Sequence, residues 1–218
     1  MTKLKNIRIL IISILCAISL LLGGCTDSSP SFSPDKGSSI TAPSVYGLAV
    51  HFIDVGQGDS ILAESDYMLI DAGENDQAGT VISYLKAQGV TKLDYVIGTH
   101  PHSDHIGGLD KVIDTFPVDK VILPPVEHTT KTFEDVLNSI APGDSYDLGD
   151  ASFTILSPVK DYGSDLNNWS VGVRLTFGDN SFVMCGDAEN QAEEDIVKNG
   201  AVLKADVLKA GHHGSSTS

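Results

Sequence analysis

The chain has 218 residues, of which 41% are hydrophobic and 20% charged, and its formal net charge is −15. This length and composition suit one globular domain with short additional segments and exclude a largely disordered chain. Three cysteines are too few for a disulfide-stapled scaffold. The excess of acidic residues argues against broad coating of nucleic acid, because such coating depends on lysine and arginine.

The first 25 residues have the pattern of an export signal. Lys3, Lys5 and Arg8 precede an apolar run over 9–22, which fits the core of a secretory signal and is shorter than the roughly 20 residues of a membrane span. Small residues then precede Cys25, as in a bacterial lipobox. We expect residues 1–25 to be a lipoprotein signal peptide with Cys25 as the lipidation site; an uncleaved signal anchor is the alternative.

Residues 26–44 are rich in serine and proline and contain almost no large apolar side chains. Such a segment cannot bury enough surface to fold, so we expect a flexible tether between a membrane and a domain. These features predict an extracytoplasmic protein that is lipid-anchored to the bacterial cell membrane. The sequence predicts no protein partner.

Residues 45–218 carry the predicted domain. Strands are predicted over 48–53, 60–64, 67–70, 93–98, 118–123, 152–156, 171–177, 181–184 and 206–209, and helices over 77–88, 107–116, 132–140 and 188–199. Asp187 is a plausible N-cap of the last helix. Hairpins come first and helices then alternate with strands, so we expect an α/β, or layered α+β, fold in which helices cover sheets.

Histidines and aspartates gather directly after the predicted strand at 93–98. His100, His102, Asp104 and His105 lie within six positions. Imidazole and carboxylate groups suit zinc or manganese. Alternate residues of a turn can point the same way, so one cation can lie between the first two side chains and a second beside the others. Structural zinc sites usually contain cysteine, and none is near, so an open, catalytic type of site is favoured over a closed one or over histidines that cap a helix.

This His-x-His-x-Asp-His run resembles that of the metallo-β-lactamase fold hydrolases, and other blocks resemble the ComEC competence-protein branch of that family. These blocks are HFIDVGQGDS at 51–60, LIDAG at 69–73, Asn167-x-x-Ser170, CGDAE at 185–189 and LKAGHHGS at 208–215. The resemblance implies an αββα sandwich. Such folds usually continue with another strand and helix, so we expect a sandwich that is incomplete at its C-terminal end, or a fragment.

The resemblance also implies a role for individual residues around two divalent ions, Zn²⁺ or Mn²⁺. It assigns His100 and His102 to the first ion, Asp104, His105 and His212 to the second, and Asp187 to a bridge between them. Asp71 would orient the ligand loop, although a plain turn residue is the alternative. Asp59 and Ser215 would lie behind the ligands or near substrate, with turn hydrogen bonding as the alternative for Asp59. Asn167 stands where the wider superfamily has a third histidine, and its neutral oxygen favours Mn²⁺ over zinc.

The adjacent pair His212-His213 needs a choice. Neighbouring side chains at a strand end are expected to point to opposite sides, so one of the two is expected to bind metal. The resemblance favours His212, which lines up with the single histidine of related hydrolases. His213 would then face substrate or donate a proton.

The predicted reaction is hydrolysis of a phosphodiester by a hydroxide that the two metal ions activate, with Asp104 or His213 as the proton donor. The resemblance suggests a nucleic acid as substrate, while the net charge argues against extended contact with DNA. One alternative is hydrolysis of a small or cell-wall phosphoester, such as a phosphocholine ester, because this fold serves many reactions. Another is a surface lipoprotein that binds a metal or a ligand without turnover.

Overall fold

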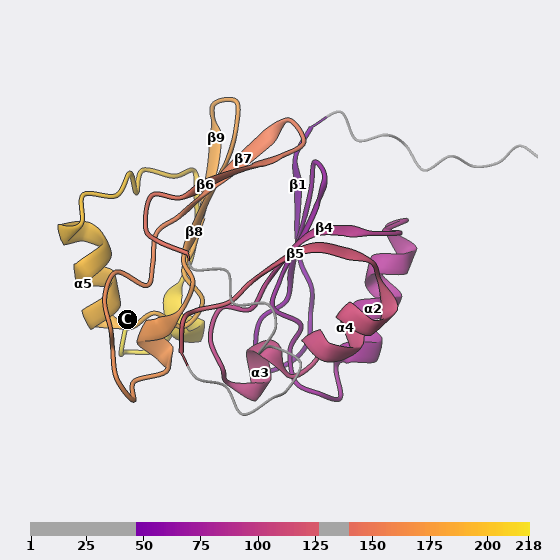
Figure 1. Ribbon diagram of the computed structural model, residues 1–218, viewed down its shortest axis with the longest axis horizontal. Coiled ribbons are helices and arrows are strands. Elements are labelled where there is room, and N and C mark those ends of the chain that lie inside the picture. Colours follow the sequence, from indigo (N-terminus) through magenta and orange to yellow (C-terminus); the bar gives the residue numbers. More distant parts are fainter. Residues whose placement is uncertain (1–46, 127–139) are drawn as a thin grey trace, which may run out of the picture. The chain divides into compact units, whose positions relative to one another are not determined.

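The computed structural model describes residues 47–126 and 140–218 (Figure 1). The predicted signal peptide with Cys25, the tether, and most of the predicted helix at 132–140 lie outside these residues. Among the described helices, none is long and apolar enough to cross a membrane.

The first half of the described chain builds one sheet of five strands in sequential order. They are β1 (Ala49–Phe52), β2 (Ile61–Glu64), β3 (Tyr67–Ile70), β4 (Leu93–Ile97) and β5 (Val118–Ile122). The first three pair antiparallel, whereas β3, β4 and β5 run parallel. Parallel neighbours need a crossover, and helix α2 (Ala78–Ala87) provides the one between β3 and β4.

The second half builds another five-stranded sheet, in the order β10-β9-β8-β7-β6. Its strands are β6 (Ser145–Leu148), β7 (Ala151–Ile155), β8 (Val173–Phe177), β9 (Asn180–Met184) and β10 (Val207–Lys209). β10 runs parallel to β9 after a crossover through α5 (Asn190–Lys198), and the other pairs are antiparallel.

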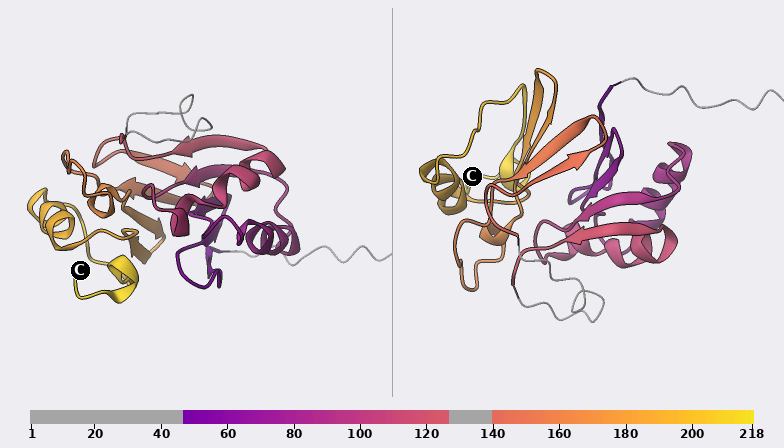
Figure 2. Two further views of the ribbon diagram at one scale, coloured as in Figure 1. Left: turned by 90° about the horizontal axis from the view of Figure 1, so that it is seen from below. Right: turned by 45° about the horizontal axis from the view of Figure 1, so that its top comes forward.

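Alternate side chains of the strands fill different cores. Met68 and Ile70 of β3 pack with Phe153 of the other sheet, whereas Leu69 packs with the residues of α2, including Val81. A third apolar cluster lies between the second sheet and α5. The order of layers is therefore helices, sheet, sheet, helix, as Figures 1 and 2 show. The predicted αββα sandwich is confirmed.

The helix predicted over 107–116 is present over a shorter range, and a separate short helix precedes it. The structure has a short α3 (Ser103–Ile106) and then α4 (Leu109–Thr115). Gly107 and Gly108 separate the two helices. A Cβ atom on Gly107 would lie 2.4 Å from the oxygen of Ser103, and one on Gly108 would lie 2.5 Å from the oxygen of Ala72. The sequence prediction missed α3 because it took the histidine run to be a plain turn.

Strand β6 was not predicted. Its residues alternate between exposed and more buried positions, yet three of the four are polar or aromatic, SYDL. β6 lies at the edge of its sheet, where one neighbour is enough and an apolar run is not required.

Asp187 is not the N-cap of α5, and this prediction was wrong. The cap position belongs to Glu189, whose side chain makes no capping hydrogen bond. Instead, Asn168 Oδ1 accepts hydrogen bonds from the backbone N–H groups of Glu189 (3.1 Å) and Ala192 (3.2 Å). The capping group thus comes from another segment, which leaves the side chain of Asp187 available for the site described below.

Candidate metal centre

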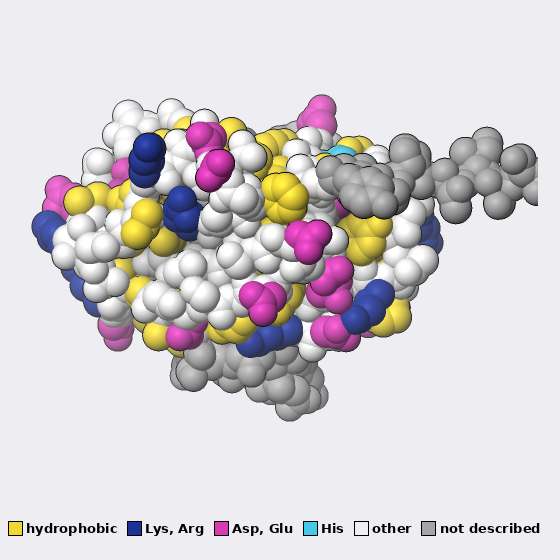
Figure 3. Space-filling view, turned by 90° about the horizontal axis from the view of Figure 1, so that it is seen from above, with side chains coloured by type: hydrophobic (Ala, Val, Ile, Leu, Met, Phe, Trp, Pro, Cys, Tyr) yellow, Lys and Arg dark blue, Asp and Glu magenta, His cyan; other side chains and the backbone are white. Residues whose placement is uncertain are grey.

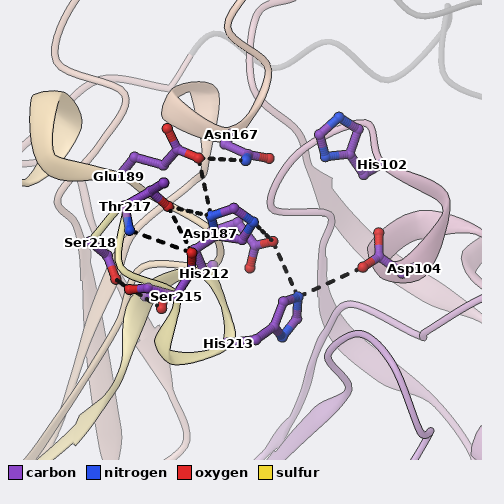
Figure 4. Close-up of polar contacts among 12 residues, drawn as sticks. His102, Asp104, Asn167, Asp187, Glu189, His212, His213, Ser215, Thr217 and Ser218 are labelled. Atoms are coloured by element: carbon purple, nitrogen blue, oxygen red, sulfur yellow. Dashed lines mark hydrogen bonds and ion pairs between the residues drawn. The ribbon is translucent and has the colours of Figure 1, made fainter.

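The candidate site lies where segments that follow four strands meet. Asp71 follows β3, the segment 99–105 follows β4, Asp187 follows β9, and His212 and His213 follow β10. Figure 4 shows side chains from both sheets facing one another.

Main-chain hydrogen bonds join these segments. Ala72 N donates to the oxygen of His105 (2.8 Å), and Val171 N donates to the oxygen of Thr99 (2.9 Å). The first bond fixes the loop after β3 to the loop after β4. The second fixes the segment that leads into β8 to the same loop, so it joins the two sheets.

Asp187 lies at the centre of the site. Its Oδ2 is 3.2 Å from Nε2 of both His105 and His213, 3.9 Å from Nε2 of His212 and 4.0 Å from Nε2 of His100. One carboxylate oxygen is therefore near the ring nitrogens of four histidines. This arrangement is compatible with the predicted bridging role of Asp187.

Four side chains form a group that could bind a metal ion. One ligand atom from each of Asp59, His105, Asp187 and His213 lies within 4.8 Å of all the others. In addition, Asp187 Oδ1 is buried and has no hydrogen-bond partner among the described residues. Because an unpaired buried carboxylate oxygen is costly, and imidazole with carboxylate suits divalent transition metals, these residues fit a metal ion.

His100 and His102 form a second pair beside this group. His100 Nε2 is 3.0 Å from His102 Nδ1. His100 is fully buried, and Thr99 Oγ1 and Ser170 Oγ lie 3.1 Å and 3.4 Å from its Nδ1. The structure thus places together the two residues predicted to share one cation.

Asp71 fixes the orientation of His105. Its Oδ2 lies 2.8 Å from His105 Nδ1, so Nε2 of the ring faces Asp187. Asp71 also accepts hydrogen bonds from Thr99, from the backbone N–H (2.8 Å) and from the hydroxyl (2.7 Å). The backbone of Asp71 is left-handed, with φ of 57°, a region that Asp and Asn tolerate better than most residues. These contacts are compatible with both a turn residue and an orienting residue, and the orienting role of Asp71 stays a prediction.

The ionisation of the buried groups favours a cation at this place. Burial lowers the pKa of His100 to about 3, with His105 adding to the effect, so His100 is neutral. Burial alone would lower the pKa of His105 as well, but Asp71 and Asp187 raise it to about 10. Burial would raise the pKa of Asp187, yet the hydrogen bond and charge of His105 lower it to about 2. The carboxylates therefore stabilise positive charge at His105, which a metal ion could supply in place of the proton.

Asp59 is shared between this group and a lysine. Lys209 Nζ lies 2.6 Å from Asp59 Oδ2, whereas His105 Nδ1 is 3.8 Å from the same oxygen. Burial raises the pKa of Asp59, and Lys209 opposes that effect. Asp59 thus contacts the cluster from the loop after β1, and its oxygen lies among the four candidate ligand atoms rather than behind them.

The turn that carries Asp59 packs against Asp104. A Cβ atom on Gly58 would lie 1.8 Å from the oxygen of Asp104, and the φ of Gly58 is +107°, so only glycine fits there. Asp104 Oδ2 is 3.7 Å from His213 Nε2 and 3.9 Å from His105 Nε2. Asp104 therefore lies at the edge of the group, while Asp54 bonds its own turn through Gly56 N.

His212 and His213 do not point to opposite sides, and that expectation was wrong. The strand ends at Lys209, and both histidines have left-handed backbones, with φ of 38° and 52°. Their Nε2 atoms consequently approach the same oxygen of Asp187. His213 belongs to the group of four, whereas His212 Nδ1 lies 3.0 Å from Glu189 Oε1. The choice of His212 as ligand stays a prediction, and these distances favour His213 beside His105.

Asn167 and Ser215 flank His212. Asn167 Nδ2 donates to Glu189 Oε1 at 2.9 Å. Ser215 N donates to the oxygen of His212, and Ser215 Oγ accepts a hydrogen bond from Thr217 Oγ1 (3.2 Å). Ser215 thus stabilises the turn that carries the two histidines and makes no direct contact with the group of four.

Several residues of the site were not singled out from the sequence. Thr99 contacts Asp71 through two hydrogen bonds, and Ser170 Oγ accepts one from Asp187 N (3.0 Å). Glu189 contacts both Asn167 and His212. Thr99 precedes the predicted ligand His100, and Ser170 and Glu189 stand in the blocks that carry the resemblance; these positions are the signal that could have indicated them.

The match to known proteins agrees with this geometry. A model of the metallo-beta-lactamase superfamily matches residues 53–218. The chain belongs to the metallo-β-lactamase superfamily. Members of this superfamily are generally metal-dependent hydrolases, and the candidate metal ligands of this chain lie inside the matched segment.

Curated relatives of this metallo-β-lactamase superfamily member include bacterial competence proteins. The chain is 29% identical over 199 residues to ComE operon protein 3 of Bacillus subtilis, covering 78% of this chain and 26% of that protein. It is 30% identical over 203 residues to competence protein ComA of Neisseria gonorrhoeae, covering 91% and 27%. The chain therefore spans about a quarter of the length of these relatives.

Solved structures agree on the fold. The subclass B3 metallo-β-lactamase MEM-A1, isolated from a soil metagenome library, has a TM-score of 0.56 at 15% identity, covering 77% of this chain and 78% of that one. At this identity the likeness establishes the shared αββα fold alone.

Proposed function

We propose that this protein is a metal-dependent phosphodiesterase that acts on nucleic acid. The observation that carries the proposal is the group of four ligand atoms from Asp59, His105, Asp187 and His213, together with the unpartnered Oδ1 of Asp187. Two divalent cations, Zn²⁺ or Mn²⁺, would complete the site. Bound there, they would supply Lewis acidity toward a phosphoryl group and allow water to attack at neutral pH.

The side chains of this chain have distinct tasks in that reaction. Asp71 and Asp187 orient His105 and provide negative charge for a cation. Asp104 Oδ2 and His213 Nε2 lie 3.7 Å apart with 21% and 26% of their side chains exposed. Asp104 can give a proton to a leaving oxygen, because it lies at the solvent side of the group, and His213 can do so where its Nε2 does not hold a cation.

The relatives support a nucleic acid as substrate. They are named ComE operon protein 3, competence protein ComA and, for one from Haemophilus influenzae, recombination protein 2. In a nucleic acid, the phosphodiester bond is the linkage that a metal-dependent hydrolase would cleave.

The charge distribution favours a second candidate, hydrolysis of a small or cell-wall phosphodiester. In the described parts of the chain, Lys209 is the lysine or arginine that contacts the group, and Asp59 pairs with it. Figure 3 shows another face of the domain, on which basic side chains also lie apart. Close to the group, a nucleic acid would therefore find Lys209 already paired with Asp59, which suits a strand end or a small ester.

We further propose that residues 1–25 direct export and that a lipid on Cys25 anchors the domain outside the cell membrane through residues 26–44. The residue pattern of these segments supports this proposal. Metabolic labelling with a palmitate analogue would test it: the label should appear on the wild-type chain and be lost in Cys25→Ala.

The test of the enzymatic proposal uses metal analysis and turnover on one sample. We expect two divalent ions per chain and hydrolysis of bis-p-nitrophenyl phosphate that chelation abolishes. His102→Ala should lose turnover, while His51→Gln, which changes a histidine outside the site, should retain it. Bound metal without turnover of any phosphodiester would contradict the proposal.

A comparison of substrates separates the two candidates. Cleavage of a single-stranded oligonucleotide that weakens steeply with salt would support nucleic acid, because phosphate contacts release counterions. Turnover of small phosphodiesters with little dependence on salt, and no cleavage of oligonucleotides, would support the second candidate instead.

A further inference from the structure

Glu189 lies at the start of α5 with a side chain that is free to reach the site. The carboxylate does not cap its own helix, because Asn168 Oδ1 bonds the backbone N–H groups of Glu189 and Ala192 in its place. Asn168 belongs to the 3-10 helix η2 (Asn167–Trp169), so the cap also fixes η2 against α5. A negative charge at a helix N-terminus is favourable, so a carboxylate suits this position.

One oxygen of Glu189 contacts two residues of the site. Oε1 accepts a hydrogen bond from Asn167 Nδ2 at 2.9 Å and lies 3.0 Å from His212 Nδ1 (Figure 4). An ionised carboxylate has no hydrogen to donate, so both partners must present a donor to it.

The contact determines the orientation of the Asn167 amide. Because Nδ2 is directed at Glu189, the carbonyl oxygen Oδ1 of the same amide points away from Glu189. Oδ1 is buried and has no hydrogen-bond partner among the described residues. In Figure 4 it lies on the side of His102. A buried carbonyl oxygen without a partner is costly, and a cation would satisfy it.

The same contact determines the tautomer of His212. Nδ1 lies 3.0 Å from Glu189 Oε1 and 2.7 Å from Thr217 Oγ1. Because the carboxylate can only accept, Nδ1 carries the hydrogen in the neutral ring, and Nε2 presents its lone pair. That Nε2 is the atom 3.9 Å from Asp187 Oδ2.

We propose that Glu189 is a positioning residue for the metal centre, one that turns Asn167 Oδ1 and His212 Nε2 toward it. A single carboxylate would thus present one oxygen donor, Asn167 Oδ1, and one nitrogen donor, His212 Nε2, to the metal centre. The oxygen donor favours a harder cation such as Mn²⁺ over zinc at this position. This inference rests on the proposed metal-dependent function.

The tautomer of His212 gives a test that needs neither metal nor turnover. Long-range nitrogen–proton NMR of the metal-free, full-length protein at mildly alkaline pH would report which ring nitrogen carries the hydrogen. We expect Nδ1–H in the wild type and a loss of that preference in Glu189→Ala. Nε2–H in the wild type would overturn the proposal.

Calorimetric titration with Mn²⁺ and with Zn²⁺ gives the second test. In Glu189→Ala, at least one binding step for Mn²⁺ should weaken by about tenfold or more, as is typical when a residue that orients ligands is removed. E189Q keeps the shape of the side chain and one acceptor oxygen, so it should lose less. Glu194→Ala, an exposed change on the same helix, is the matched control and should bind as the wild type does.

The outcomes separate this proposal from the proposed function. Unchanged Mn²⁺ binding in Glu189→Ala would overturn the positioning role. If the wild type nevertheless bound two ions and turned over substrate, the proposed function would remain intact. Absence of metal binding and turnover in the wild type would contradict the function, and the NMR result on the metal-free protein would still decide the role of Glu189.

Discussion

The two halves of the site differ in how firmly the fold fixes their ligands. His100 and His105, from the loop after β4, are 0% exposed. His212 and His213, from the turn after β10, have 28% and 26% of their side chains exposed. The first half is prepared by packing before any ligand arrives, and the second half faces solvent, where a substrate would enter.

The position of the strands explains this difference. β4 pairs with β3 and β5 on its two sides, whereas β10 is a three-residue edge strand that pairs with β9. The two left-handed histidines after β10 carry backbone strain of about 1–3 kcal/mol each. We therefore expect metal binding to order the β10 side more than the β4 side.

Asp187 joins the two halves, so its removal should have the largest effect. Asp187→Asn keeps the size of the side chain and removes the charge that faces four histidines. We expect turnover of bis-p-nitrophenyl phosphate to fall by about a hundredfold or more, since metal ions supply several kcal/mol to such reactions. Asp179→Asn, in the exposed turn before β9, is the control. Full activity of Asp187→Asn would remove Asp187 from the site.

Paired variants would sharpen the contrast between the halves. Asp71→Asn tolerates the left-handed backbone but breaks a buried ion pair, so the free energy of unfolding in chelator should fall by about 3 kcal/mol. Metal affinity should fall about 10–100-fold. His213→Asn should lose metal affinity but change the unfolding free energy by less than about 1 kcal/mol, because its ring is partly exposed. Urea titrations would measure both. Equal destabilisation by Asp71→Asn and His213→Asn would show that the fold does not fix the two halves of the site differently.

Two glycines of one turn test how the β1 loop supports Asp104. A Cβ atom on Gly58 would clash with the oxygen of Asp104, whereas one on Gly56 would meet nothing within 4 Å, and both residues have positive φ. Gly56→Ala should cost about 1–2 kcal/mol of stability through backbone strain, and Gly58→Ala should cost more because the clash adds to the strain. Gly58→Ala alone should also reduce turnover, by about tenfold. Equal turnover in the two variants would show that the turn does not position Asp104.

The smallest effect concerns a single proton. The pKa of His105 in the folded, metal-free protein is about 10, raised from 6.5 against the effect of burial by Asp71 and Asp187. Its contribution to stability is thus fully present below about pH 6.5 and is lost as the pH rises through about 10. Below about pH 10, where His105 is protonated in the metal-free protein, metal binding should release about one proton. Calorimetry in two buffers with different heats of ionisation would measure the release, and its absence would contradict the charge on His105.

The β4 half of the site was predictable because its residues are neighbours in the sequence. His100, His102, Asp104 and His105 follow one apolar strand, and a strand followed by a histidine-rich turn is a local pattern. The layers of the fold were likewise predictable from the order of strands and helices. Asp187 was indicated by its place after a strand.

The remaining contacts depend on distances through space. Asn168 caps α5 from another segment, Glu189 reaches His212 across the site, and Lys209 pairs with Asp59 of the opposite sheet. The directions of His212 and His213 depend on backbone angles that the end of β10 does not impose. No periodicity of a single sequence contains these pairings, so the structure was needed to find them.

The main-chain bonds between Ala72 and His105 and between Val171 and Thr99 have an evolutionary consequence. A substitution other than one to proline keeps both backbone groups of such a bond. The spacing of the positions around the centre can therefore be inherited unchanged while the residues at those positions vary. Such a scaffold can exchange one ligand side chain for another, and with it the metal preference, without a new fold.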